Sequence, residues 1–65
     1  MLIEIYKAWF FTGQVKVAIQ IWGFDSDHAS NNATERAMQE GWSFLGAMDH
    51  LGTLNLERCL ELHPQ

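Results

Sequence analysis

The clearest periodicity in the chain lies at residues 15–22, where apolar side chains occupy every second position. The odd positions hold Val15, Val17, Ile19 and Ile21. A period of two with β-branched residues on one side predicts a half-buried strand. Residues 2–11 are rich in isoleucine and aromatic side chains and predict a second strand. Residues 12–14 join the two and include Gly13, which adopts positive φ without a steric penalty, so we expect a β-hairpin.

The register of this hairpin depends on the length of its loop. A two-residue loop at Thr12 and Gly13 places Leu2, Glu4, Tyr6, Ala8 and Phe10 on the face of the Val15 series. A three-residue loop places Ile3, Ile5, Lys7, Trp9 and Phe11 there instead, because a slip of one residue moves every side chain to the other face. We favour the first register, since it turns inward only Glu4, near a strand end, whereas the second buries Lys7.

Positions 23–32 are polar and rich in turn-forming residues, which predicts a loop. The loop ends in a pattern typical of a helix start. Asn32 can cap the first backbone N–H groups, and Glu35, three residues later, can reach back to the cap. We therefore expect a helix to begin at Ala33.

The predicted helix covers residues 33–51. Its apolar residues recur at helical spacing and are Ala37, Met38, Gly41, Phe44, Leu45, Met48 and Leu51. This amphipathic pattern places Ala33, Ala37 and Gly41 where they would let the helix lie close to the sheet. Because glycine is unfavourable within a helix, a shorter helix that ends at Glu40 remains an alternative.

Leucines recur at positions 54, 56, 60 and 62, in a segment that alternates over residues 54–62. Alternation predicts a third strand, although Leu56, Cys59 and Leu60 also fit one face of a helix. We therefore predict a single compact domain over residues 1–65 with an α+β fold. It consists of a small single-layer antiparallel sheet with one helix packed on it, in the order β-β-α-β.

Composition and charge narrow the classes of function. The chain has 65 residues, 48% of them hydrophobic, and a net charge of −4. A domain of this size buries only about 60% of its unfolded surface, and a single cysteine excludes an internal disulfide. Four basic residues are too few for a nucleic-acid-binding stripe, so direct nucleic-acid binding is not expected. The sequence has neither a secretory signal nor an apolar stretch of about 18 residues. We expect a cytoplasmic protein without a membrane partner.

The chain has few residues arranged for catalysis or metal binding. Asp25 and Asp27 resemble the start of a calcium loop, but Ser30 and Arg36 stand where that loop needs glycine and glutamate. Cys59 and His63 would lie about 13 Å apart on a strand and would be neighbours on a helix, but no third group supports a nucleophile in either case. We therefore expect no metal, no cofactor and no enzymatic activity.

Aromatic residues are the more informative group. The chain has three tryptophans, four phenylalanines and one tyrosine. One helix covers only one face of the sheet, so the other face exposes aromatic side chains. Trp22 faces outward in either register. Its neighbours are Trp9 and Phe11 in one register, or Tyr6 and Phe10 in the other. These five residues are the candidate partner-binding residues, because tryptophan and tyrosine are enriched at binding hot spots.

The sequence thus favours a small acidic protein–protein interaction module. The β-β-α-β order, size and acidic character make it similar to small phage-encoded inhibitors of host machinery, including anti-CRISPR proteins. This resemblance rests on architecture and size and includes no diagnostic motif. It implies an inhibitor or modulator that binds a larger, basic protein, for example one that handles nucleic acid, or a second copy in a homodimer. The alternative is a homo-oligomeric small enzyme or ligand-binding protein whose pocket forms between subunits from tryptophan, histidine and Cys59.

Overall fold

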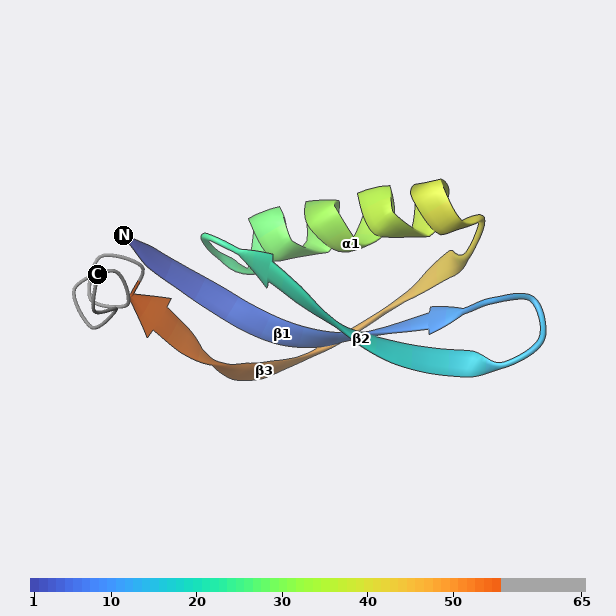
Figure 1. Cartoon of the computed structure of the whole chain (residues 1–65), viewed down its shortest axis with the longest axis horizontal. Coiled ribbons are helices and arrows are strands. Elements are labelled where there is room, and N and C mark those ends of the chain that lie inside the picture. The colour runs from blue at the N-terminus through green and yellow to red at the C-terminus, as the bar shows by residue number, and fades with distance from the viewer. Residues whose placement is uncertain (56–65) are drawn as a thin grey trace, which may run out of the picture.

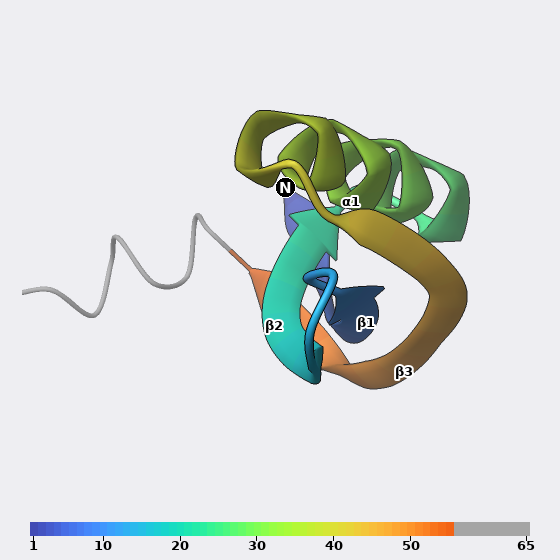
Figure 2. The ribbon, with the colours of Figure 1, turned by 90° about the vertical axis from the view of Figure 1, so that its right-hand side faces the viewer.

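The computed structural model describes residues 1–55, which form a three-stranded antiparallel sheet with one helix on it (Figure 1). The elements are β1 (Leu2–Phe11), β2 (Lys16–Gly23), α1 (Ser26–Glu40) and β3 (Ser43–Asn55). β1 is the central strand of the order β2-β1-β3. Viewed along the molecule, α1 lies on one side of the sheet (Figure 2). The predicted α+β class and the order β-β-α-β are confirmed.

The predicted hairpin is confirmed, with its loop one residue further along than expected. The backbone N–H of Thr12 donates to the carbonyl of Val15 over 3.0 Å, so Gly13 and Gln14 form the turn. Moving a two-residue loop by one position shifts the pairing by two residues and leaves each side chain on the same face. Phe10 therefore pairs with Val17, and the favoured assignment of faces is correct.

The core between the sheet and α1 is built largely from small side chains. The buried apolar residues are Ala8, Phe10, Ile21, Ala29, Ala33 and Ala37. Around them pack the half-buried Tyr6, Val17, Ile19, Trp42, Phe44 and Met48. The alanines lie four residues apart on one stripe of α1. Gly23 also lets α1 lie close to β2, since a Cβ added there would lie 2.3 Å from the backbone nitrogen of Ala29.

The loop predicted for positions 23–32 is wrong, because α1 already begins at Ser26. Its N-cap is Asp25, whose Oδ1 accepts a hydrogen bond from the backbone N–H of His28 over 2.8 Å. Asn32, the predicted cap, lies within α1, and its side-chain amide donates to the carbonyl of Trp22 over 2.7 Å. The polar residues of this segment face solvent, and the residues that face the sheet are alanines. Because alanine is only weakly hydrophobic, the segment shows little of the hydrophobic periodicity that predicts a helix.

The helix predicted over residues 33–51 is also wrong, and the shorter alternative that ends at Glu40 is correct. Gly41 follows with φ 73°, a left-handed conformation that other residues adopt with strain. The backbone N–H of Trp42 then donates to the carbonyl of Ala37 over 2.8 Å. This bond is the C-terminal closure of a Schellman motif, and it turns the chain back toward the sheet.

The residues assigned to the second half of that helix form β3 instead. Phe44 pairs with Phe10 and Met48 pairs with Ala8, so both face the core. A spacing of four residues returns to the same face on a strand as well as on a helix, which explains the error. Three other residues of the expected apolar face are exposed, namely Met38, Leu45 and Leu51.

The strand predicted over residues 54–62 lies mostly outside the described residues. Its first two, Leu54 and Asn55, are the last residues of β3. The third strand of the fold is therefore earlier in the chain than the alternation suggested.

The cap of α1 provides a test of the observed helix start. We expect Asp25→Ala to lower the free energy of unfolding by about 1 kcal/mol, because the N–H of His28 loses its acceptor. Asp25→Asn keeps a side-chain oxygen and should change stability by less than half as much. Urea unfolding followed by circular dichroism measures both. Equal stability of Asp25→Ala and the wild type would contradict this helix start.

Candidate interaction surface

The sheet face opposite α1, here called the outer face, carries most of the exposed aromatic side chains. The strand pairings place on it Ile3, Ile5, Lys7, Trp9 and Phe11 of β1, Lys16, Ala18, Gln20 and Trp22 of β2, and Asp49 and Leu54 of β3. Within residues 1–55, no second layer packs against this face (Figure 2). The outer face is thus the largest surface from which a binding role can be argued.

Trp9 lies on the central strand of the outer face, near the hairpin loop, and is held by charged neighbours. The ammonium groups of Lys7 and Lys16 lie 4.9 and 5.0 Å from the centroid of its ring. The indole Nε1 donates to the carboxylate of Asp49 over 3.4 Å. Cation–π contacts at exposed sites contribute about 0.5–1 kcal/mol each, enough to favour one ring orientation. The outer face therefore combines an aromatic ring with two positive charges near the hairpin loop.

Trp22 belongs to an aromatic cluster that extends the outer face around the end of β2. Its ring contacts Phe24 and His28 edge-on, with centroids 5.6 and 5.3 Å away. Phe24 and His28 stack at 4.9 Å. The backbone N–H of Phe24 also donates to Nδ1 of His28 over 3.0 Å, which orients the imidazole. Trp22 remains 46% exposed despite these contacts, so it is held in place and still accessible.

A shallow hollow of about 270 Å³ lies at the end of the sheet where β1 and β3 pair. Its lining residues are Ile5, Gln20, Leu51, Gly52, Thr53 and Leu54. Leu51 stands at a bulge of β3, where the register against β1 shifts between Ile5 and Tyr6. The hollow adds a depression to the part of the outer face that lies away from the hairpin loop.

The structure places three of the five candidate partner-binding residues on the outer face and two on the core face. Trp9, Phe11 and Trp22 lie on the outer face. Phe10 is fully buried, and Tyr6 is half-buried with its ring 5.2 Å from that of His50. The sequence listed both sets because it left the register open. A surface role for Phe10 is therefore excluded in this fold.

Sequence reasoning missed two features of this surface. It did not place Phe24 beside Trp22, because it assigned the residues after β2 to a loop. It also did not place two lysines over Trp9, although the spacing of Lys7 and Trp9 on one strand face was a signal for the nearer contact.

Charge is divided between the two sides of the molecule. Acidic residues gather on and just before α1, where Asp25, Asp27, Glu35 and Glu40 lie. Both described lysines lie on the outer face, which has Asp49 as its acidic residue. The acidic residues of α1 and the lysines of the outer face therefore lie on opposite sides of the sheet.

A small polar cluster links β1 to β3 on the side of α1. Oε1 of Glu4 lies 2.8 Å from Nε2 of His50 and accepts a hydrogen bond from the hydroxyl of Thr53 over 2.9 Å. A carboxylate that orients an imidazole is part of a catalytic triad, but the nucleophile must bond the imidazole. Here the hydroxyl bonds the carboxylate instead. The cluster acts as a cross-strand contact that includes an ion pair when His50 is protonated.

Within residues 1–55, no group of three or more histidine, cysteine or acidic side chains could hold a metal ion. The same part of the chain has no helix that is long and apolar enough to cross a membrane. Cys59 and His63 lie outside the described residues. Comparison of the chain with protein-family models, with curated proteins and with solved structures gives no match.

Proposed function

We propose that this protein is a small interaction module that acts by binding rather than by catalysis, and that its outer face binds a larger protein and inhibits or modulates it. The observation that supports this proposal is the uncovered aromatic face of the sheet. Exposed contiguous apolar surface marks interaction sites in small soluble proteins. Trp9, Phe11 and Trp22 supply the aromatic anchors on which binding free energy usually concentrates.

The charges of the outer face define the chemistry of the partner surface. Lys7 and Lys16 flank Trp9, so the complementary surface is apolar at its centre and carries carboxylates around it. The acidic side chains of α1 favour approach to a basic molecule from the other side. Of the two sides, the outer face would hold the partner, through an acidic and apolar patch on the partner's surface.

The size of the module favours action by steric coverage of a target. A typical stable interface buries about 800 Å² on each partner, and the described residues expose 4747 Å² in total. The outer face is one side of a twisted three-stranded sheet (Figure 2) and can supply an area of that order. A protein that binds through most of one side sterically blocks the surface that it covers, which is how an inhibitor can act.

The test uses one substitution on each side of the molecule. Phe11 is 42% exposed on the outer face, and Met38 is 78% exposed on α1. We expect Phe11→Glu to weaken partner binding by roughly 30-fold, the effect of losing a hot-spot residue, and Met38→Glu to leave it unchanged. Immobilised wild type and both variants are exposed to extract of the source cell, and the retained proteins are quantified by mass spectrometry.

A protein retained by the wild type and by Met38→Glu but lost with Phe11→Glu supports the proposal. Both variants must keep the circular dichroism of the wild type for the comparison to count. Loss of the partner with Met38→Glu instead would move the binding site to α1. Equal retention by all three would remove the outer face as a binding site.

A further inference from the structure

The open edge of β2 presents a row of backbone groups to solvent. The backbone hydrogen bond from Thr12 to Val15 identifies these two residues as a hydrogen-bonded pair of the hairpin. Because such pairs alternate along an antiparallel ladder, the odd residues of β2 direct their backbone N–H and C=O groups toward β1. The even residues, Lys16, Ala18, Gln20 and Trp22, then direct their N–H and C=O groups outward. The side chain of Asn32 on α1 bonds the carbonyl of Trp22 in agreement with this direction. The other outward groups lie along residues 16–20.

The edge of β2 has less protection against strand pairing than the edge of β3 has. Natural sheets protect edges with bulges, prolines and charged residues. β2 pairs with β1 in an unbroken register, contains no proline, and has Lys16 as its one charged residue. β3 has two register shifts against β1 and a positive φ at Gly46. Of the two edges in the described sheet, β2 is the one suited to accept a further strand.

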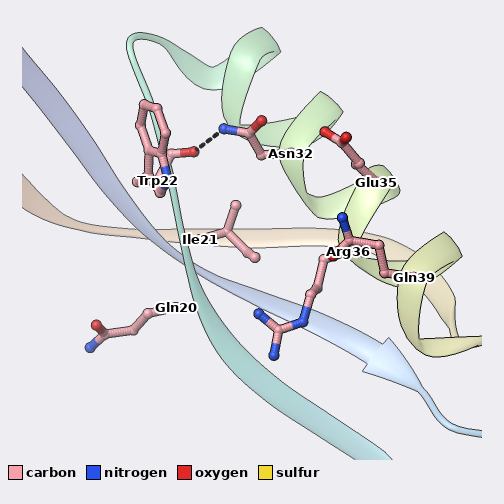
Figure 3. Close-up of a pocket in the computed structure, with 7 residues that line it drawn as sticks. All are labelled: Gln20, Ile21, Trp22, Asn32, Glu35, Arg36 and Gln39. Carbon is pink, nitrogen blue, oxygen red and sulfur yellow. Dashed lines mark hydrogen bonds between the residues drawn. The ribbon is translucent and has the colours of Figure 1, made fainter.

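A groove runs between this edge and α1. It has a volume of about 230 Å³ and is lined by Gln20, Ile21, Trp22, Asn32, Glu35, Arg36 and Gln39 (Figure 3). Ile21 points toward α1, while Gln20 points away from it and the side chain of Arg36 extends from α1 to the edge (Figure 3). Nε of Arg36 lies 3.5 Å from the carboxylate of Glu40. The helix side of the groove therefore carries both signs of charge.

We propose that the β2 edge pairs with the β2 edge of a second copy of this chain, antiparallel across a two-fold axis, to give a six-stranded sheet. This surface differs from the outer face, and the inference does not depend on the proposed function. The two-fold places the same side of each sheet on the same side of the dimer. The outer faces of the two copies would then form one continuous surface.

The sequence of β2 is complementary to itself in this arrangement. With Ile19 on the axis, Val17 lies opposite Ile21 of the second copy on the core side, which pairs apolar β-branched residues. On the outer side, Lys16 lies opposite Trp22 of the second copy, a cation–π pairing that joins the two copies. Ala18 lies opposite Gln20, so no two like charges face each other across the axis. Isologous contacts of this kind are the commonest form of homodimer.

The small core adds a reason for this pairing. Phe10 is the one large side chain that is fully buried within residues 1–55. Domains of this size commonly gain stability by oligomerisation. Pairing along β2 would cover the half-buried Val17 and Ile19 from the edge side. It would also bring the Arg36 side of α1 near the same side of the second helix, where Arg36 can meet Glu40 or Glu35 of the second copy.

Hydrogen exchange of the wild-type protein tests the pairing directly. The amide hydrogens of Ile19 and Ile21 bond β1 in any state and should be protected throughout. Those of Ala18 and Gln20 face outward, so we expect protection only in a dimer. Their exchange should slow by at least about tenfold as protein concentration rises through the dimer dissociation constant, which corresponds to a 10:1 ratio of paired to open edges. Sedimentation measures the oligomeric state in the same samples.

Two variants separate the edge from the outer face. Gln20→Pro removes an outward N–H and leaves the bonds to β1 intact, which edge strands tolerate. We expect it to raise the dimer dissociation constant by more than about tenfold. Phe11→Ala, on the outer face, adds no charge opposite Lys16 and should leave dimerisation unchanged. If Gln20→Pro does not fold, the exchange pattern of the wild type still decides the question.

The remaining outcomes would overturn the proposal. A protein that stays monomeric at all concentrations does not use the edge for a second copy. A dimer weakened by Phe11→Ala and not by Gln20→Pro pairs through the outer face. Amides of Ala18 and Gln20 that become protected only on addition of a partner protein would assign the edge to that partner. Because binding through the outer face is tested separately by partner retention, either proposal can fail without the other.

Discussion

Replacing Phe10 with alanine is expected to lower the free energy of unfolding by about 3–5 kcal/mol, a large part of the total. Phe10 is fully buried, and its ring contacts Trp42 and Phe44 at centroid distances of 5.8 and 5.5 Å. Truncation of a buried phenylalanine costs about 3–5 kcal/mol. A domain of this length has a free energy of unfolding of about 3–10 kcal/mol. The other fully buried side chains are alanines, which cannot move in to fill the cavity.

Phe11→Ala is the matched control, since it removes the same side chain from the next position. Phe11 is 42% exposed on the outer face, so its loss should cost less than about 1 kcal/mol. Urea unfolding followed by tryptophan fluorescence compares the two variants. This pair also tests the hairpin register, because the three-residue loop would exchange the two positions. A larger destabilisation by Phe11→Ala than by Phe10→Ala would show that the faces are reversed.

Gly23→Ala is expected to destabilise the protein by about 2–3 kcal/mol, although it adds a single methyl group. The added Cβ would lie 2.3 Å from the backbone nitrogen and 2.7 Å from the Cα of Ala29. Both atoms belong to the backbone of α1, so no side-chain rotation can relieve the clash. Overpacking of this kind typically costs about 1–3 kcal/mol. Relief requires α1 to move away from β2, which would also open the contact between Asn32 and Trp22.

Gly52→Ala is the control for this prediction. Gly52 lies in β3, has no positive φ, and an added Cβ would meet no atom within 4 Å. Its replacement should change the free energy of unfolding by less than about 0.5 kcal/mol. Thermal unfolding measures both variants. Similar melting temperatures for Gly23→Ala and the wild type would mean that α1 does not approach β2 at Gly23.

The predictions for Phe10→Ala and Gly23→Ala concern the core that supports the outer face. Phe10 and Gly23 act on the opposite side of the sheet from Trp9 and Trp22, so their effect on binding would be indirect. The functional variants, Phe11→Glu and Gln20→Pro, change groups that point away from this core. Stability measurements and binding measurements therefore report on separate surfaces of the same sheet.

The sequence by itself determined the hairpin, the face of β2 that meets the core, and the order β-β-α-β. These features are local, because alternation along residues 15–22 and the glycine in the turn act within a few residues of each other. The exposure of Trp22 followed from the same alternation. The five candidate residues narrowed to Trp9, Phe11 and Trp22 only when the pairing with β1 was known.

The tertiary structure decided the bounds of α1 and the assignment of residues 43–55 to β3. The alanine stripe of α1 has little hydrophobicity of its own, and it stabilises a helix only because Gly23 and the sheet allow close approach. Phe44 and Met48 have a spacing that suits a helix or a strand. Gly41 ends the helix before them, and the edge of β1 that β2 leaves free then pairs with this segment as a strand. The open edge of β2 is likewise a property of the assembled sheet. Its outward backbone groups exist for any sequence, and only strand order determines which of them lack a neighbour.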